Sequence, residues 1–234
     1  MSVFKFKQFT IHQDKTAMKI GTDSILFGSW LQTNTSCKSI LDIGTGTGLL
    51  ALMMAQKNPE ATITALEIDL DAFSQAQENV ANCKWTDRID LVHANANLWR
   101  TDKKYDLLIS NPPYFQNSLK SIGFARTNAR HQVDFIIEDL LSLWGKLGSE
   151  KSELACVLPT DQAEILIDLA CKNLYFLKTQ TLVRSSSEGK VIRQLLLFSK
   201  EKAPTVKSEL CIYTFDKQYT KAYIDLTIDF YLGL

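Results

Sequence analysis

Apolar and polar residues form two kinds of pattern along this chain, one typical of strands and one typical of helices. Short apolar runs predict strands at residues 40–43, 62–67, 89–93, 105–110 and 153–158. Apolar residues at helical spacing predict helices between or after these strands, at residues 49–57, 70–83, 133–145 and 161–172. Strands that alternate with helices form a parallel sheet with helices on both faces. We therefore predict a doubly wound α/β fold.

The C-terminal part of the pattern departs from this alternation. Two further strands are predicted at 175–183 and 191–198, and the polar stretch 184–190 between them is typical of a hairpin loop. Strands joined in this way are antiparallel. The predicted sheet thus has seven strands, is mostly parallel, and ends in a reversed C-terminal hairpin.

We expect one domain over residues 1–234, with an N-terminal extension (1–35), a core (36–200) and a C-terminal tail (201–234). The extension has a strand-like alternation at 4–11, then a helix at 25–31 that a capping cluster at 22–24 precedes. The tail contains a short strand at 210–215 and a stretch at 223–232 that fits either a strand or a helix.

Composition narrows the class of protein. The five cysteines are an odd number without a C-x-x-C pair, which argues against a disulfide framework and a zinc site and favours a reducing cytoplasm. We find no signal-like apolar start and no stretch long enough to span a bilayer, and we expect neither a membrane nor a metal partner. The formal net charge of zero is unusual for a nucleic-acid binder but leaves a locally positive face possible. A monomer is expected.

A glycine-rich turn connects the predicted strand 40–43 to the helix 49–57. Its glycines, Gly44, Gly46 and Gly48, follow Asp42 and let a ligand approach the backbone closely. Leu49 occupies the place of the third glycine of the dinucleotide fingerprint, which opposes a nicotinamide oxidoreductase. The next strand ends at Glu67, and a carboxylate there suits the hydroxyls of a ribose.

The residues Asn111-Pro112-Pro113-Tyr114 follow the predicted strand 105–110. The prolines stiffen the backbone and hold Asn111 extended. The Asn111 amide oxygen and the Pro112 carbonyl are two acceptors, and the Tyr114 ring can stack on a planar group. Two acceptors and an aromatic face can hold a planar amine such as the exocyclic amine of adenine.

These motifs together resemble the S-adenosylmethionine-dependent amino-methyltransferases with a Rossmann-like fold. The resemblance implies that the methionine part of the cofactor lies over the glycine turn, that Glu67 holds the ribose, and that Asn95 stands where the family commonly has an aspartate for the adenine. The implied cofactor-binding residues are Asp42, Gly44, Thr45, Gly46, Gly48, Glu67, Asn95, Asn111, Thr22 and Asp23.

The resemblance also implies direct transfer of the methyl group to an amine nitrogen, with Asn111, Pro112 and Tyr114 as the catalytic residues. Acceptance of both amine N–H groups by Asn111 and Pro112 aims the nitrogen lone pair at the methyl group, which favours the transition state. No general base is needed before the transfer.

The same clamp serves adenine in nucleic acid, guanine in ribosomal RNA and glutamine in release factors. About 40 residues precede the glycine turn, too few for the helical substrate domain of the glutamine enzymes, which favours a base. Residues 18–30 and 125–132 resemble the bacterial methyltransferases of adenine N6 next to the anticodon of a valine tRNA. The implied contacts to the tRNA anticodon loop come from Tyr114, Phe115, Arg126, Arg130 and His131. A ribosomal base, a release-factor glutamine and a non-catalytic cofactor-binding module stay open as alternatives.

Overall fold

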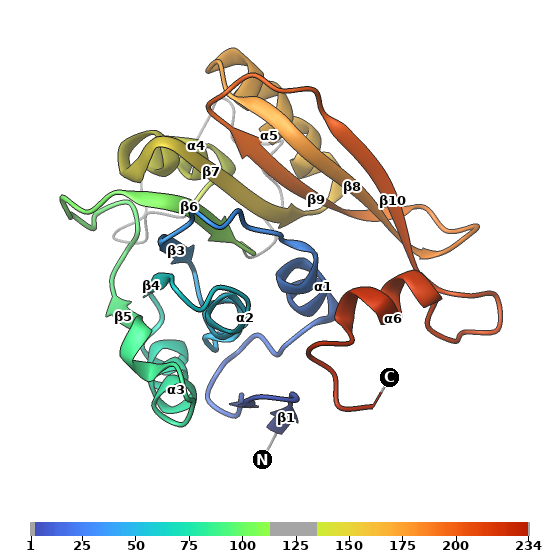
Figure 1. The fold of residues 1–234 in the computed structure, drawn as a ribbon, viewed down its shortest axis with the longest axis horizontal. Coiled ribbons are helices and arrows are strands. Elements are labelled where there is room, and N and C mark those ends of the chain that lie inside the picture. Colours follow the sequence, from blue (N-terminus) through green and yellow to red (C-terminus); the bar gives the residue numbers. More distant parts are fainter. Residues whose placement is uncertain (1–2, 113–134, 234) are drawn as a thin grey trace, which may run out of the picture.

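The computed structural model describes residues 3–112 and 135–233. Its centre is one sheet of eight strands in the order β10-β8-β9-β7-β6-β3-β4-β5, shown in Figure 1. The strands are β3 (Ser39–Ile43), β4 (Thr62–Glu67), β5 (Ile89–His93), β6 (Tyr105–Ser110), β7 (Gly148–Leu158), β8 (Phe176–Ser186), β9 (Val191–Ser199) and β10 (Val206–Tyr213). Only β9 runs antiparallel to its neighbours in this sheet.

Helices cover both faces of the sheet. The helices of the described part are α1 (Thr22–Trp30), α2 (Leu49–Lys57), α3 (Leu70–Ala81), α4 (Ile137–Leu147), α5 (Thr160–Lys172) and α6 (Lys221–Thr227), with one 3-10 turn, η1 (Thr86–Arg88). Successive strand residues contribute to two different apolar clusters, as Ile40 and Leu41 do. The cluster of Ile40 includes α1 and α2, and that of Leu41 includes α4 and α5. This alternation is what a sheet buried on both faces requires.

The predicted α/β fold with a reversed C-terminal hairpin is confirmed, and the bounds of β4, β5, β6 and α2 agree with the pattern. The sheet has one strand more than the predicted seven, because β10 pairs in parallel with β8 at the edge. The polar residues 184–186, expected in the hairpin loop, continue β8, since Arg184 still pairs with Val191 of β9.

The N-terminal segment forms two strands where one was expected. β1 (Val3–Lys5) and β2 (Thr10–His12) make a small antiparallel pair. It lies beside the end of the chain, because the Lys7 N–H donates to the Phe230 carbonyl at 2.9 Å and Phe6 forms a β-bridge with Tyr231. The two ends of the chain are thus neighbours (Figure 1). The ambiguous stretch at 223–232 contributes to the helix α6.

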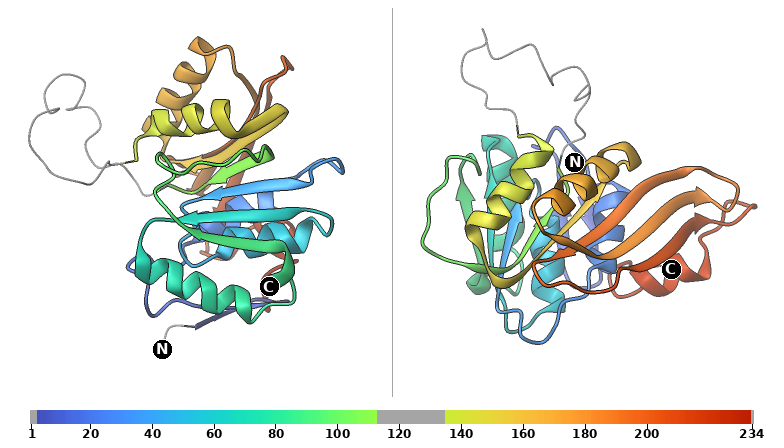
Figure 2. Two further views of the ribbon diagram at one scale, coloured as in Figure 1. Left: turned by 90° about the vertical axis from the view of Figure 1, so that its left-hand side faces the viewer. Right: turned by 90° about the horizontal axis from the view of Figure 1, so that it is seen from above.

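The parallel strands of the sheet place the candidate site. The carboxyl ends of β3, β4, β5 and β6 meet at one edge, and the segments that follow these strands carry the motifs found in the sequence. The two views of Figure 2 show α1 and α2 on one side of the sheet and α4 and α5 on the other. Within residues 3–112 and 135–233, no helix is long and apolar enough to cross a membrane.

Candidate functional site

The glycine turn after β3 has a backbone that only glycine adopts readily. Gly44, Gly46 and Gly48 have φ angles of 73°, 58° and 83°, in the left-handed region. A Cβ atom added to Gly44 or Gly46 would meet nothing within 4 Å. The turn therefore presents bare backbone to an open space, and Gly48 is the N-cap residue from which α2 starts.

Asp42 lies beneath this turn and is fully buried. Its Oδ2 accepts a hydrogen bond from the Thr45 hydroxyl at 2.6 Å, whereas its Oδ1 has no hydrogen-bond partner among the described residues. Burial raises the pKa of Asp42 to about 7, the Thr45 hydroxyl opposes this rise, and the nearby Glu67 adds to it. Asp42 therefore supports the turn from below and carries a charge that changes near neutral pH.

Glu67, at the end of β4, is also buried, but backbone N–H groups surround its carboxylate. Its Oε2 accepts from the Gly46 N–H at 2.8 Å. Its Oε1 accepts from the N–H groups of Ile68 and Asp69, each at 2.9 Å. Glu67 thus binds the glycine turn to the segment after β4, and Oε2 keeps one lone pair for a hydroxyl group.

Asn95 lies after β5 at the same edge of the sheet. Its Oδ1 accepts from the Asn97 N–H at 2.9 Å in a local turn, and the Asn97 side chain donates to Asp139 of α4 at 2.8 Å. Ile68 and Leu70, which follow Glu67, are 59% and 63% exposed. These two apolar side chains are available to pack against a planar ligand at this edge.

Asn111 and Pro112 directly follow β6. Asn111 is half-buried, and its Nδ2 donates to the Ser24 hydroxyl of α1 at 2.7 Å. Pro112 is buried, and the Ser110 hydroxyl ties the end of β6 to the Ile43 carbonyl of β3 at 2.8 Å. The other residues predicted for catalysis and substrate binding lie outside the described residues: Tyr114, Phe115, Arg126, Arg130 and His131.

The prediction that residues 22–24 form a helix cap is wrong. The N-cap residue of α1 is Gly21, without a side-chain cap, and Thr22 is the first helical residue. The side chains of Asp23 and Ser24 instead contact residues far away in the sequence. Asp23 Oδ2 pairs with Arg193 Nε at 2.7 Å, and the Ser24 hydroxyl accepts a hydrogen bond from Asn111. Helix α1 therefore connects the start of β9 to the end of β6.

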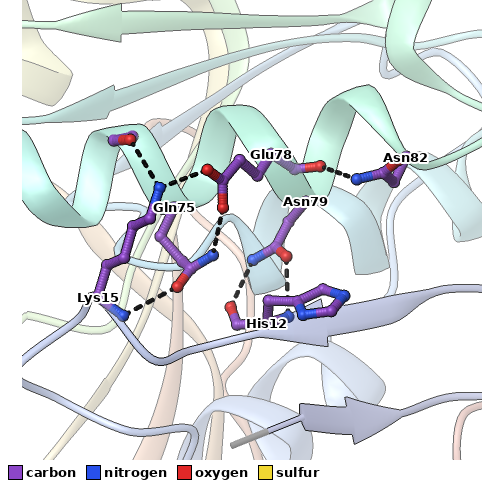
Figure 3. Close-up of polar contacts among 7 residues, drawn as sticks. His12, Lys15, Gln75, Glu78, Asn79 and Asn82 are labelled. Atoms are coloured by element: carbon purple, nitrogen blue, oxygen red, sulfur yellow. Dashed lines mark hydrogen bonds and ion pairs between the residues drawn. The ribbon is translucent and has the colours of Figure 1, made fainter. Parts of the chain in front are cut away.

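The strap, residues 12–20, connects β2 to α1 and lies on α3 (Figure 3). Asn79 of α3 accepts from the His12 N–H and donates to the His12 carbonyl, both at 2.8 Å, and also donates to the Thr47 carbonyl of the glycine turn at 2.9 Å. Gln75 accepts from the Lys15 N–H at 3.0 Å. Both amide side chains are buried, so they replace the hydrogen bonds that a neighbouring strand would supply.

Sequence reasoning missed Gln75, Asn79 and Ser24. A signal for the first two was present, since they are four residues apart on the same face of α3 as the buried Ala72 and Ala76. Amide side chains on an otherwise apolar helix face indicate that they form hydrogen bonds in the interior of the protein.

The edge of the sheet thus combines an open glycine turn, two buried carboxylates and the start of the Asn-Pro-Pro-Tyr segment. Such a site can hold a ligand with a cationic group and hydroxyl groups, and can present carbonyl oxygens to an amine. Outside the undescribed stretches, we find no group of acidic, histidine or cysteine residues that could hold a metal ion.

Comparisons with known proteins show the family to which the chain belongs. The family model described as "Methyltransferase small domain" matches residues 16–133. Similar curated proteins include the tRNA1(Val) (adenine(37)-N6)-methyltransferases of Pseudoalteromonas translucida, Bacteroides thetaiotaomicron and Haemophilus influenzae. The first is 40% identical and spans 100% of both chains, the second is 40% identical over 99% of this chain and 98% of its own, and the third is 42% identical over 99% of both.

Solved structures resemble the chain in fold. A predicted O-methyltransferase from Agrobacterium tumefaciens aligns with a TM-score of 0.70 and 18% identity over 89% of this chain and 96% of its own. TrmK of M. capricolum, solved with S-adenosyl-homocysteine, aligns with a TM-score of 0.55 and 14% identity over 80% of this chain and 71% of its own. At these identities the likeness establishes the fold alone.

Proposed function

Because the chain belongs to the family of the tRNA1(Val) (adenine(37)-N6)-methyltransferases, we propose that it transfers a methyl group from S-adenosylmethionine to N6 of an adenine in tRNA. The observation that carries the proposal is the identity of about 40% over the full length of these relatives. The base is the adenine immediately 3′ of the anticodon of a valine tRNA. The Asn111-Pro112 segment, beside the glycine turn, supplies two hydrogen-bond acceptors that suit the adenine amine.

The residues at the sheet edge fit S-adenosylmethionine. The open space over Gly44 and Gly46 admits a ligand against bare backbone, and the remaining lone pair of Glu67 suits a ribose hydroxyl. The buried charge of Asp42 favours a cationic ligand above the turn. Thr45 and Gly48 hold the turn in shape, and Thr22, Asp23 and Asn95 border the site. When bound, S-adenosylmethionine supplies the methyl group from a positively charged sulfur.

The catalytic contribution of this chain is to orient the amine. The Asn111 Oδ1 and the Pro112 carbonyl accept hydrogen bonds from the two N–H groups of the adenine amine. Acceptance of both withdraws the lone pair from the ring and aims it at the methyl group, an arrangement that is favoured more strongly in the transition state than in the ground state. Tyr114 stacks on the base.

A loop adenine is a physically reasonable target for this clamp. Bases in single-stranded loops are read by proteins after being splayed out, and their extrusion costs little. Phe115, Arg126, Arg130 and His131 complete the tRNA contact in this proposal. The protein acts as a monomer, as one domain, in the cytoplasm.

The test is transfer of a radiolabelled methyl group from S-adenosylmethionine to tRNA that lacks this modification, followed by nucleoside analysis. We expect N6-methyladenosine in wild-type reactions. We expect no product with Asn111→Ala, whose cofactor affinity measured by calorimetry should stay near that of the wild type. Equal loss of turnover and cofactor affinity in this variant would mean that Asn111 is structural.

Label in ribosomal RNA or in a release factor, without label in tRNA, would keep the chemistry and overturn the substrate. Cofactor binding without transfer to any of the three would favour a binding module.

A further inference from the structure

We propose that Ser24 is a positioning residue for methyl transfer, which holds the Asn111 side-chain amide in the orientation that receives the amine. The inference rests on the proposed function and assigns a task to a residue of the N-terminal segment. Its starting observation is the hydrogen bond of 2.7 Å from Asn111 Nδ2 to Ser24 Oγ, which joins residues 87 positions apart.

The carboxamide of Asn111 is planar, and its oxygen and nitrogen point in different directions. Because Nδ2 is directed at Ser24 of α1, Oδ1 is directed away from that helix. No described residue donates a hydrogen bond to Oδ1, so this acceptor is available for a substrate amine. Rotation of the amide by half a turn would present N–H donors to an amine that itself donates, and the interaction would become repulsive.

The hydrogen bond can hold this orientation only if α1 is itself fixed. The ammonium group of Lys57 caps the end of α1, because it donates to the carbonyls of Gly28, Ser29 and Leu31. The Trp30 indole N–H donates to Thr181 at 2.9 Å. These contacts immobilise the last turn of the helix.

The middle and the start of α1 are equally constrained. At Gly28, an added Cβ atom would lie 2.5 Å from the sulfur of Met53 in α2, so the two helices are in close contact. At the start of the helix, Asp23 pairs with Arg193 of β9. Since α2 starts from the glycine turn, α1 connects Asn111 to the element that presents the cofactor.

Ser29 provides a matched control in the same helix. It is 3% exposed, and its hydroxyl has no hydrogen-bond partner among the described residues. The Ser29→Ala variant removes the same atom as Ser24→Ala but breaks no side-chain hydrogen bond. A loss of kcat in Ser24→Ala that Ser29→Ala does not show therefore reports on the bond to Asn111.

The experiment measures kcat, the KM for unmodified tRNA, the cofactor Kd and the melting temperature of wild type, Ser24→Ala, Ser24→Thr and Ser29→Ala. We expect kcat of Ser24→Ala to fall about tenfold to a hundredfold, since small errors of orientation in a reactive group cost rates of this size. The KM, the cofactor Kd and the melting temperature should stay near the values of Ser29→Ala. Ser24→Thr retains the hydroxyl and should recover most of kcat.

Three results would overturn the inference. Full kcat in Ser24→Ala would show that the bond is dispensable. A parallel loss of kcat, cofactor affinity and melting temperature would show that Ser24 merely supports the fold. A Ser24→Thr variant as slow as Ser24→Ala would show that the hydroxyl is not the group that matters. A wild-type protein that transfers nothing to tRNA would refute the proposed function itself, which the wild-type reaction alone reveals.

Discussion

The neighbouring strands β3 and β4 each end near a buried carboxylate, and the two carboxylates have different surroundings. Glu67 of β4 accepts three backbone N–H groups, one from the glycine turn and two from its own loop. Asp42 of β3 accepts one side-chain hydroxyl, and its second oxygen has no hydrogen-bond partner in the described part of the chain. Equal burial therefore does not give equal stabilisation of the charge.

The different surroundings give Asp42 and Glu67 different roles, although both are acidic residues near the end of a strand in the sequence. Three backbone N–H groups point at the Glu67 carboxylate, so the residue can anchor the glycine turn to the segment after β4. The charge of Asp42 is poorly compensated, and burial raises its pKa to about 7. A cationic ligand above the turn would relieve this cost, so we expect Asp42 to couple cofactor binding to pH.

The largest expected effect on cofactor affinity is that of Glu67→Gln. The new amide nitrogen must face either the Gly46 N–H or the N–H groups of Ile68 and Asp69, so that donor meets donor. An unsatisfied buried polar group costs about 1–3 kcal/mol, which corresponds to a loss of cofactor affinity of about tenfold to a hundredfold if the turn shifts. Calorimetry measures this loss, and Glu60→Gln, at a side chain that is 78% exposed, is the control. Unchanged affinity in Glu67→Gln would remove Glu67 from the cofactor site.

Asp42→Asn should lower cofactor affinity less than Glu67→Gln does, and it should raise the stability of the cofactor-free protein. The folded-state pKa of about 7 lies above the ordinary value of 3.8, so the stability that protonated Asp42 gives is full below pH 4 and is lost as the pH rises through 7. Urea unfolding of the cofactor-free protein at pH 8 should show Asp42→Asn more stable than wild type by up to about 4 kcal/mol, since each pKa unit of the shift corresponds to about 1.4 kcal/mol. At pH 5, where wild-type Asp42 is largely neutral, the difference should shrink.

The pH dependence of cofactor affinity is a second test of the role of Asp42. We expect Asp42→Asn to bind S-adenosylmethionine about tenfold more weakly at pH 8, because the buried negative charge is gone. Wild-type affinity should fall between pH 8 and pH 6 as Asp42 takes up its proton, whereas that of the variant should change little. A wild-type affinity that is flat over this range would mean that Asp42 is only a structural support.

The sequence was informative where structure depends on neighbouring residues. The ends of β4, β6 and α2 follow from local apolar runs and the glycines or prolines beside them, and the same local signals located the glycine turn and Asn111. The difference in hydrogen bonding between Asp42 and Glu67 could not be predicted from the sequence, because it depends on which N–H groups the folded backbone directs at each carboxylate.

The failed predictions concern partners that are far apart in the chain. A tail strand was predicted at 210–215, but its place in the sheet was not, because β10 joins the sheet only through the edge of β8. Residues 22–24 do not cap α1; Asp23 pairs with Arg193 and Ser24 accepts from Asn111 instead. Residues brought together over such separations leave no periodic signal, so the positioning task of Ser24 emerged only from the fold.

The smallest expected effect on cofactor affinity comes from Asn79, which supports the glycine turn from the side of α3. Asn79→Ala leaves the N–H and carbonyl of His12 and the carbonyl of Thr47 without their partner at a site that is 1% exposed. We expect a loss of about 2 kcal/mol in urea unfolding and a drop of about threefold in cofactor affinity, because the Asp42 and Glu67 contacts to the turn remain. Asn82→Ala is the control, since the side chain of the exposed Asn82 donates to the Glu78 carbonyl of its own helix and, among the described residues, to no other group. If Asn79→Ala weakened the cofactor as strongly as Glu67→Gln, the strap and α3 would govern the turn more than the two carboxylates do.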